Sequence, residues 1–322
     1  MTQLAAARGG LARWARGDSW TLGLIVIFVG LFVFTKLLRP SYGLDALAIA
    51  SLPVAFAAAG QAIVVISGGI DLSIGSVMAL TNVIAASLFL SYPELSVPIL
   101  FAVMLIGLLI GAINGVLVVV SRVPDIVATL AMLFVWAGVA LLVLGTPGGA
   151  STPWLRDISS GTLGIELIPR ALLILFAIVG VVWIPLRRSR LGLSIYAIGS
   201  NQLAAFRSGV NVQGTKIAAY ALTGFFASLG GLALTASTGI GTPIPGPYLL
   251  LSVAAIVLGG VSLAGGRGGL LGPIVGIYIL GLIRADLTFI GMEPAFSTVI
   301  QGVIMVIVVM VGAYLTLRRK AT

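Results

Sequence analysis

The sequence predicts an all-α polytopic membrane protein, and three observations support this fold class. Of the 322 residues, 59% are hydrophobic and 8% are charged, whereas soluble domains carry about 25% charged residues. Apolar segments of about twenty residues, the length that crosses a bilayer as a helix, recur along the chain. Most lysines and arginines lie between these segments, as the cost of burying a cation in a membrane requires. We therefore expect a single transmembrane domain over residues 1–322.

About ten apolar segments are predicted to be membrane helices. In chain order they are Trp20–Leu38, Asp45–Ile66, Ile74–Leu90, Val97–Val120, Ile126–Gly145, Pro169–Leu186, Ile217–Ser237, Leu249–Ala264, Leu270–Phe289 and Ala295–Leu317. Several contain glycines four residues apart, a spacing that lets helix backbones approach closely in lipid. The clearest sets are Gly107, Gly111 and Gly115, and Gly272 with Gly276.

The distribution of cations predicts the orientation of these helices. With ten spans and the N-terminus inside, thirteen cations fall on the inner side: Arg8, Arg13, Arg16, Arg122, Arg187, Arg188, Arg190, Arg207, Lys216, Arg267, Arg318, Arg319 and Lys320. The outer side keeps five: Lys36, Arg39, Arg156, Arg170 and Arg284. By the positive-inside rule both termini are expected to be cytoplasmic.

The composition excludes several functional classes. Cysteine and histidine are absent, which excludes disulfides, thiol chemistry, imidazole metal ligands and a histidine general base. No phosphate-binding GxxxxGKS or GxxxxGKT motif occurs, so any ATP hydrolysis is expected in another chain. We predict no catalytic residue, no metal site and no cofactor bound by this chain. The net charge of +9 does not indicate nucleic-acid binding, because the cations gather at the ends of spans.

The longest basic connection, residues 187–216, holds five cations and no acid: Arg187, Arg188, Arg190, Arg207 and Lys216. Within it, Ser200 or Asn201 is predicted to cap a short helix that Gly209 ends. Two interpretations remain open. The helix is presented to a soluble partner, or the basic segment only fixes the topology.

The stretch from Ser67 to Ser76 reads SGGIDLSIGS. Its glycine pair is predicted to interrupt the helix, which gives discontinuous helices near a pore. Asp71 is predicted to cap the following helix at Ser73 or Ile74. The alternative is an ion or proton site, although no second carboxylate or lysine is expected in a neighbouring span to act as a relay.

Polar side chains inside the spans are expected to face the bundle interior, because lipid cannot satisfy them. They suit a neutral solute rich in hydroxyl groups, or they join helices to one another. These residues are Gln61, Asn82, Asn114, Thr129, Thr223 and Gln301.

Two outer connections are expected to be able to touch an external partner. Residues 146–168 contain Trp154, a residue suited to a membrane interface. Residues 238–248 contain Pro243, Pro245 and Pro247 and are expected to be stiff. On the inner side, the glycine-rich turn around Arg267 belongs to a stretch, IVLGGVSLAGGRGGLLG, that faintly repeats IVVISGGIDLSIGS. The match is too weak to define an internal repeat.

Three stretches taken together resemble a known family. GGIDLSIGSVMAL, AIGSNQLAAFRSGVNV and LGGVSLAGGRGGLLGPIVG, in this order, are similar to the membrane permeases of ribose-type sugar ABC importers. The resemblance extends over about Leu47 to Leu315. It implies a multi-pass permease of the bacterial inner membrane that works with a second permease chain, identical or paralogous, and with two ATPase subunits. A solute-binding protein would deliver a sugar or polyol.

The resemblance also implies site residues. An ATPase-coupling segment would use Gly199, Asn201, Ala204, Ala205, Arg207 and Gly209, with both alanines against the partner. The translocation pathway would use Gly68, Gly69, Asp71, Leu72, Ser73 and Gly75, to which we add the amides Gln61, Asn82 and Asn114. Ser200 and Gln202 depart from the family pattern, which often has glycine and an acidic residue there. The loss of the acid at Gln202 argues against docking by charge.

Two other classes of function compete with the permease. One is a secondary transporter driven by protons or sodium, with Asp71 as the coupling acid. The other is a membrane-embedded enzyme, which the lack of catalytic pairs makes a poor fit. The sequence leaves open which sugar is carried.

Overall fold

The computed structural model describes residues 19–164 and 168–293, and residues 295–310 except 298, 301, 305, 308 and 309. Eight helices in this part of the chain are long and apolar enough to cross a membrane. They are α2 (Ser19–Leu38), α3 (Leu44–Ile66), α4 (Ile74–Ser91), α5 (Ser96–Ser121), α6 (Asp125–Val143), α8 (Arg170–Arg188), α11 (Val212–Thr238) and α13 (Leu271–Phe289). They confirm the all-α polytopic class and correspond to the first seven predicted segments and the ninth.

The tenth predicted segment and both basic termini lie wholly or partly outside the described residues. The prediction of ten spans with both termini inside therefore stays a prediction. The eighth segment, Leu249–Ala264, is wrong in its second half, since α12 (Tyr248–Leu258) stops after 11 residues. Gly259 and Gly260 end it, because Gly260 takes a left-handed conformation at φ +78° that favours glycine.

Helix α3 forms the centre of the bundle and is buried from Ser51 to Ile66. Its middle, AFAAAGQA from residue 55 to residue 62, is made almost entirely of small residues. Small side chains let neighbouring backbones come close where lipid provides no hydrophobic driving force. Helices α4, α8, α11, α12 and α13 all contact α3.

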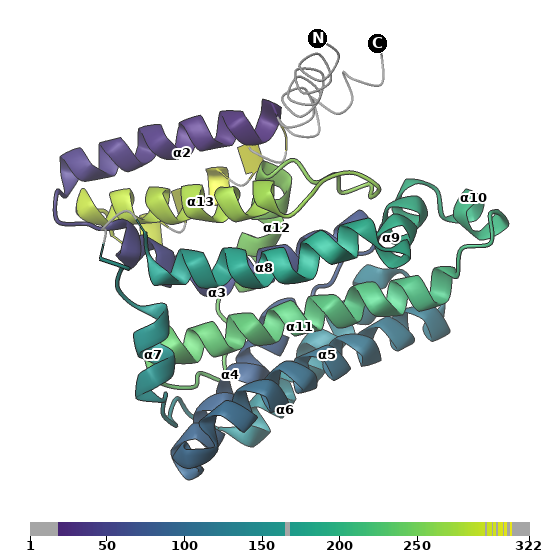
Figure 1. Cartoon of the computed structure of the whole chain (residues 1–322), viewed down its shortest axis with the longest axis horizontal. Coiled ribbons are helices and arrows are strands. Elements are labelled where there is room, and N and C mark those ends of the chain that lie inside the picture. The colour runs from purple at the N-terminus through teal and green to yellow at the C-terminus, as the bar shows by residue number, and fades with distance from the viewer. Residues whose placement is uncertain are drawn as a thin grey trace, which may run out of the picture.

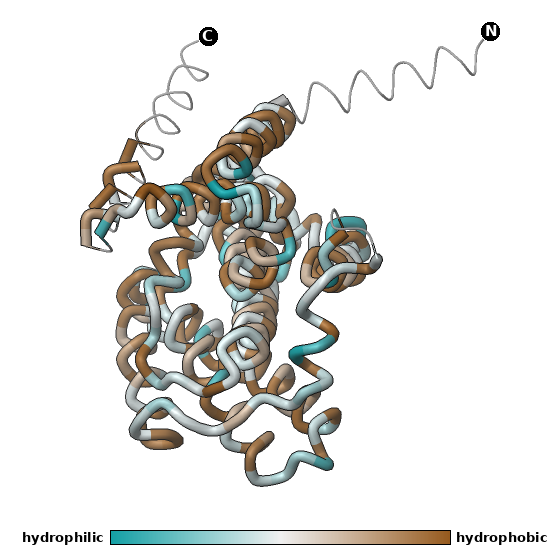
Figure 2. Tube along the Cα trace, turned by 90° about the vertical axis from the view of Figure 1, so that its left-hand side faces the viewer, coloured by the Kyte–Doolittle hydropathy of each residue, from teal (hydrophilic) through white to brown (hydrophobic). Residues whose placement is uncertain are grey.

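The other helices lie on two sides of this centre. Figure 1 shows α2 and α13 together along one side, α3 and α8 in the middle, and α11, α5 and α6 along the other side. Figure 2 shows hydrophobic residues along most of the helices, with hydrophilic residues more frequent in the connections. Large apolar side chains on α2, α5 and α6 point outward, for example Val26, Phe101 and Phe134. Such an apolar exterior suits a lipid environment or a second membrane subunit.

Glycines make a close helix crossing between α5 and α11, as their spacing predicts. A Cβ atom added to Gly111 would collide with the Tyr220 carbonyl oxygen and lie 2.9 Å from the Gly224 nitrogen. Gly107 meets Ser228 and Gly224 in the same way, and Gly115 meets Ile217. On the other side, Gly272 of α13 abuts Gly259, which follows α12, and Gly276 abuts Ala255 of α12. The predicted close approach at both glycine sets is confirmed.

The faint repeat in the sequence corresponds to a repeated turn. At the end of α3, the N–H groups of Ser67, Gly68 and Gly69 donate to Ile63, Val65 and Val64. At the end of α12, Gly259, Gly260 and Val261 donate in the same pattern to Ala255, Val257 and Ile256. Both sets satisfy carbonyl groups that a helix end leaves free. The two stretches resemble each other in the way that they end a helix, and this resemblance does not define a larger repeat.

The connections gather at two ends of the bundle, which we call the α10 end and the α7 end. The α10 end holds α9 (Arg190–Ser200), α10 (Gln202–Arg207) and the connection 259–270. The α7 end holds α7 (Pro153–Ser159) and the connections 39–43 and 239–247. Figure 1 shows α7 toward the left-hand end of the bundle and α10 at its right-hand end.

The described cations divide unevenly between these ends. Seven lie at the α10 end: Arg122, Arg187, Arg188, Arg190, Arg207, Lys216 and Arg267. Five lie toward the α7 end: Lys36, Arg39, Arg156, Arg170 and Arg284. The α10 end carries more cations than the α7 end, as the positive-inside rule requires if the α10 end faces the cytoplasm.

The helices α7 and α9 lie where the sequence predicted only connecting segments. Pro153 occupies the first turn of α7, a position at which proline fits a helix. The Ser189 hydroxyl caps α9 by accepting a hydrogen bond from the Gly192 N–H at 3.1 Å. Both start signals are present in the sequence, although neither helix is longer than 11 residues.

Overpacking of the α5–α11 crossing tests the importance of this contact. We expect Gly111→Val to destabilise the purified protein by about 1–3 kcal/mol, because α11 backbone atoms occupy the space that the side chain needs. Gly30→Val on α2 is the matched control, since an added Cβ there meets nothing within 4 Å. Thermal melting in detergent measures both, and equal melting temperatures would contradict the assigned packing.

The orientation can be tested with single cysteines, because the chain has none. Asp157 of α7 and Ser208, which follows α10, are both exposed. We expect an impermeant thiol reagent to label Asp157→Cys on intact cells, and to label Ser208→Cys only after the membrane is opened. Labelling of Ser208→Cys on intact cells would reverse the orientation.

Candidate functional site

The connection between α3 and α4, residues 67–73, lies inside the bundle near the α10 end. Its Ile70 carbonyl oxygen is 3.3 Å from the hydroxyl of Tyr220. Tyr220 follows the first residue of α11 by eight positions, a rise of about 12 Å along a helix. Gly68, at φ +85°, lets the chain leave α3. Irregular backbone at this depth must be surrounded by protein or water, as predicted for discontinuous helices.

Asp71 holds the start of α4, as the sequence predicts. Its Oδ1 accepts hydrogen bonds from the Ser73 N–H at 2.8 Å and from the Ser73 hydroxyl at 2.6 Å. Only 1% of Asp71 is exposed, and among the described residues it forms no ion pair. Two hydrogen bonds to one carboxylate oxygen stabilise the charge at the N-terminus of a helix.

The Asp71 cap continues into two neighbouring helices. The Asn114 amide of α5 donates to the Ser73 hydroxyl at 2.7 Å, and the Trp136 indole of α6 donates to the Asn114 carbonyl at 3.0 Å. Asn114 therefore joins α4, α5 and α6 through side chains that satisfy one another. Hydrogen-bonded chains of this kind fix the relative positions of helices in an apolar surrounding.

The other two amide side chains predicted for the pathway, those of Asn82 and Gln61, differ in their hydrogen bonding. Asn82, further along α4, donates to Thr235 at 2.8 Å and to the Ile240 carbonyl at 3.2 Å, and accepts from the Thr242 N–H at 2.7 Å. It thus anchors the connection 239–247 to α4. Gln61 is fully buried on α3, and neither of its polar atoms has a hydrogen-bond partner among the described residues. Thr129 and Thr223 are buried as expected, whereas Gln301 lies outside the described residues.

The proline-rich connection, predicted over residues 238–248, was expected to be an outer loop that an external partner can touch. Ile244 is 68% exposed, and another part of the connection packs within the bundle. An added Cβ at Gly75, in the first turn of α4, would lie 3.5 Å from the Leu249 nitrogen and 3.9 Å from Pro245. The connection therefore packs near the segment that carries Asp71. The two outer connections also meet, since Gly148 and Gly241 exchange backbone hydrogen bonds of 3.0 and 2.7 Å.

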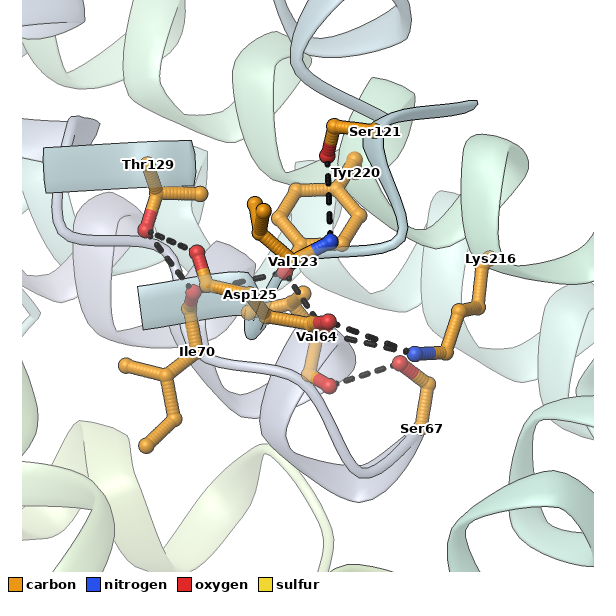
Figure 3. Close-up of polar contacts among 9 residues, drawn as sticks. All are labelled: Val64, Ser67, Ile70, Ser121, Val123, Asp125, Thr129, Lys216 and Tyr220. Carbon is orange, nitrogen blue, oxygen red and sulfur yellow. Dashed lines mark hydrogen bonds and ion pairs between the residues drawn. The ribbon is translucent and has the colours of Figure 1, made fainter. Parts of the chain in front are cut away.

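A second polar cluster holds the loop 67–73 from the other side (Figure 3). The Tyr220 hydroxyl lies 3.1 Å from Asp125 Oδ2, and Lys216 Nζ lies 3.4 Å from the same carboxylate. Thr129, one turn after Asp125 on α6, accepts a hydrogen bond from the Leu72 N–H at 3.1 Å. Sequence reasoning missed this cluster and expected no second carboxylate or lysine in a neighbouring span, whereas Asp125 belongs to α6 and Lys216 to α11. That expectation is wrong, because residues 91 positions apart meet here.

The helix predicted in the basic connection is confirmed as α10. The Asn201 side chain caps it by accepting from the Ala204 N–H at 2.9 Å. Gly209, at φ +82°, ends it, and the Val210 N–H donates back to the Ala205 carbonyl at 3.1 Å. Its exposed apolar side chains are Leu203, at 58%, and Phe206, at 67%.

Two residues of the predicted coupling set point inward. Ala205 is only 6% exposed, so the expectation that both alanines face a partner is wrong for Ala205. Gly199 packs against the end of α3 and the connection 259–270, because an added Cβ would collide with the Ile66 carbonyl and lie 2.6 Å from the Gly266 nitrogen. Ala204 and Arg207 are exposed. A six-residue helix is too short for its sequence to show which side is buried.

Helix α9 also contacts the glycine-rich connection 259–270. The Tyr196 hydroxyl donates to the Gly268 carbonyl at 2.7 Å. Burial raises the pKa of Tyr196 above its ordinary value, although Arg187 lowers it in part, so the hydroxyl keeps the proton that it donates. The Gly266 N–H donates to the Ile66 carbonyl at 2.9 Å. The ends of α3 and α9 and the connection 259–270 therefore form one packed junction.

The capping role of Asp71 can be tested by stability. Asp71→Asn keeps an oxygen acceptor for Ser73, so we expect a melting temperature close to that of the unsubstituted protein. Asp71→Leu removes the acceptor of the Ser73 N–H and of the Ser73 hydroxyl proton, and we expect a loss of about 1–3 kcal/mol. Thermal melting in detergent distinguishes the two variants. A stable Asp71→Leu protein would show that the cap is dispensable.

Comparison with known proteins agrees with this architecture. A family model described as the permease component of a branched-chain amino acid transport system matches residues 43–309. The ribose import permease protein RbsC of Escherichia coli (strain K12) is 35% identical over 262 residues, which cover 80% of this chain and 81% of that protein. No solved structure matches the chain.

Two further relatives carry other substrate names. The galactose/methyl galactoside import permease protein MglC of Escherichia coli (strain K12) is 33% identical over 284 residues, 82% of this chain and 84% of that protein. The fructose import permease protein FrcC of Rhizobium meliloti is 30% identical over 277 residues, 81% of this chain and 75% of that protein. Because the family match spans most of the chain and the relatives are aligned over most of their length, this protein belongs to that family of transport-system permease components.

Proposed function

We propose that the chain is the membrane-spanning permease of an ATP-driven importer and that α10 is its contact with a separate ATPase subunit. The observation that carries this proposal is the construction of α10. It is capped at both ends, it stands at one extreme of the molecule, and it exposes Leu203 and Phe206. A rigid helix with two exposed apolar side chains fits a hydrophobic groove on another protein. A loop that only set topology would need its cations and no such apolar surface.

The solute that we propose is a sugar or polyol. The three relatives are named for ribose, galactose and fructose, whereas the family description names branched-chain amino acids. An amino acid carries an ammonium and a carboxylate group, which a buried site would match with charges of both signs. The buried polar side chains in the middle of the bundle are mainly neutral amides and hydroxyls, such as Gln61, Thr223 and Ser228. The chemistry of the interior thus favours a neutral solute.

In this proposal the chain is a multi-pass protein of the bacterial inner membrane and works in a larger assembly. Two permease chains, identical or paralogous, would pair with two ATPase subunits at the α10 end. A solute-binding protein would approach the α7 end, where Trp154 donates to Ser96 at 2.9 Å and fixes α7 against α5. Because the sequence has no phosphate-binding motif, ATP would be hydrolysed by the partner alone.

The second candidate function is a secondary transporter with Asp71 as the coupling acid. Both hydrogen bonds to Asp71 Oδ1 come from Ser73, the residue directly before α4. This arrangement supports a capping role for Asp71. In proteoliposomes, an importer would accumulate labelled sugar only with ATP and its ATPase, and a protonophore would not abolish uptake. Uptake that is driven by an ion gradient without the ATPase, and is lost in Asp71→Asn, would favour the secondary transporter.

Docking through α10 predicts a specific loss of partner binding. We expect Phe206→Asp to reduce co-purification of the ATPase by at least about tenfold, the effect typical of losing a buried aromatic anchor. Its melting temperature should not change, because Phe206 is exposed. Arg207→Ala is expected to be milder, because water screens exposed charges.

Ile158→Asp provides the matched control for Phe206→Asp. Ile158 is an exposed apolar residue on a short helix, α7, at the opposite end. We expect it to leave ATPase binding unchanged. The proposed docking role would fail if Phe206→Asp and Ile158→Asp held the ATPase equally well.

A further inference from the structure

The ion pair between Lys216 and Asp125 is the one ion pair found among the described residues. Its side chains are mostly buried, at 15% and 17% exposed, with 3.4 Å between Nζ and Oδ2. The pair lies on the wall of a pocket of about 340 Å³ that Arg122, Gln202 and Gln213 also line. Gln202 is the first residue of α10. The pocket therefore borders α10, the α5–α6 connection and the start of α11.

On one side, Asp125 is joined to the loop that carries Asp71. The Tyr220 hydroxyl lies 3.1 Å from Asp125 Oδ2 and 3.3 Å from the Ile70 carbonyl oxygen, so it bridges α6, α11 and the loop. The absence of a side chain at Gly69 makes room for this arrangement. A Cβ there would lie 2.7 Å from Asp125 Oδ2 and 2.9 Å from the Tyr220 hydroxyl. Any larger residue would separate the loop from the cluster.

On the other side, Lys216 is joined to α10 by a short and ordered connection. Asn211 caps α11 by accepting from the Gly214 N–H at 2.9 Å, and its carbonyl accepts from the Thr215 hydroxyl at 2.7 Å. Four residues, 208–211, separate α10 from α11, and they are tied back to α10 through Val210. A displacement of α10 would therefore move the first turns of α11, which carry Lys216.

We propose that Tyr220, Asp125 and Lys216 are positioning residues that transmit movement of α10 to the loop 67–73. The inference rests on the proposed function, because it assumes that an ATPase moves α10. When α10 is displaced, Lys216 shifts relative to Asp125, and the contact of Tyr220 with the Ile70 carbonyl changes with it. Asp71 then moves with its loop, without itself exchanging a proton.

Stability alone does not account for this cluster. A partly buried ion pair is often replaced by apolar residues of similar size without loss of stability, because burial of the charges offsets their attraction. Pairs of this kind do serve where two arrangements of an element must be distinguished. The adjacent pocket leaves space for the Lys216 side chain to move.

The first experiment measures the position of the loop without any solute or partner. Ile70→Cys introduces a single thiol into a chain that has none, and Ile70 is partly exposed. In the purified full-length protein, we expect Tyr220→Phe to accelerate labelling of this thiol by about fivefold, the effect of losing one hydrogen bond. Tyr278→Phe is the control, since its buried hydroxyl has no partner among the described residues. Equal labelling rates in the two backgrounds would overturn the proposal.

The second experiment measures coupling in proteoliposomes that contain the ATPase, the binding protein and labelled ribose, galactose or fructose. We expect Tyr220→Phe and Lys216→Met to keep ATPase binding and ATP hydrolysis, while sugar taken up per ATP falls by about fivefold. The double variant should be no worse than the more affected single variant, because both interrupt one connection.

A parallel fall in hydrolysis, uptake and melting temperature would show a merely structural role and would also overturn the proposal. If the unsubstituted complex took up none of the three sugars, the substrates named for the relatives would be excluded for this permease. The labelling experiment would still decide whether the cluster holds the loop.

Discussion

The requirement that backbone polar groups inside a membrane find partners governs this structure. Residues 67–73 leave the helical conformation within the bundle, where water is scarce and each unpaired N–H or carbonyl group is costly. Partners come from four directions: Ser73 bonds to Asp71, Thr129 to Leu72, Tyr220 to Ile70, and the Gly266 N–H to Ile66. These contacts bring together α4, α6, α11 and the connection 259–270. The interrupted helix thus determines which neighbours must surround it.

Small residues make this gathering possible. The alanine-rich middle of α3 and the glycines of α5 and α11 bring backbones close enough for short side chains to bridge them. The Thr223 hydroxyl donates to the Gly60 carbonyl at 2.9 Å, and a Cβ atom added to Gly60 would lie 3.0 Å from the Thr223 carbonyl oxygen. Close packing in turn means that an element at the α10 end cannot move without shifting its neighbours. The same small residues therefore let buried polar groups reach their partners and make neighbouring helices move together.

Sequence reasoning succeeded where the signal was local. Segment length predicted eight of the helices, and Asn201, Gly209 and Asp71 were readable as caps because their partners lie two or three residues away. It failed where the partner is distant, since Asp125 and Lys216 are 91 residues apart and each resembles an ordinary loop charge. It also failed for Ala205, because one buried face of a six-residue helix leaves no periodic pattern. The end of α12 could have been predicted from the sequence, because Gly259 and Gly260 repeat the glycine pair that was recognised as a helix break after Ile66.

The distribution of hydrogen bonds distinguishes the fixed parts of the site from the parts suited to movement. Asp71, Ser73, Asn114 and Trp136 are joined by bonds of 2.6–3.0 Å, distances typical of well-formed hydrogen bonds. The contacts of Tyr220 and Lys216 are longer, at 3.1–3.4 Å, and they lie beside a pocket. Longer contacts are weaker, so a displacement would break them before it broke the Asp71 cap. The loop is held firmly at both ends, by the Asp71 cap and by the backbone hydrogen bonds that end α3, and more weakly at Ile70 between them. Under the proposed coupling, a movement of this loop at Ile70 would alter the path without unfolding the interrupted helix.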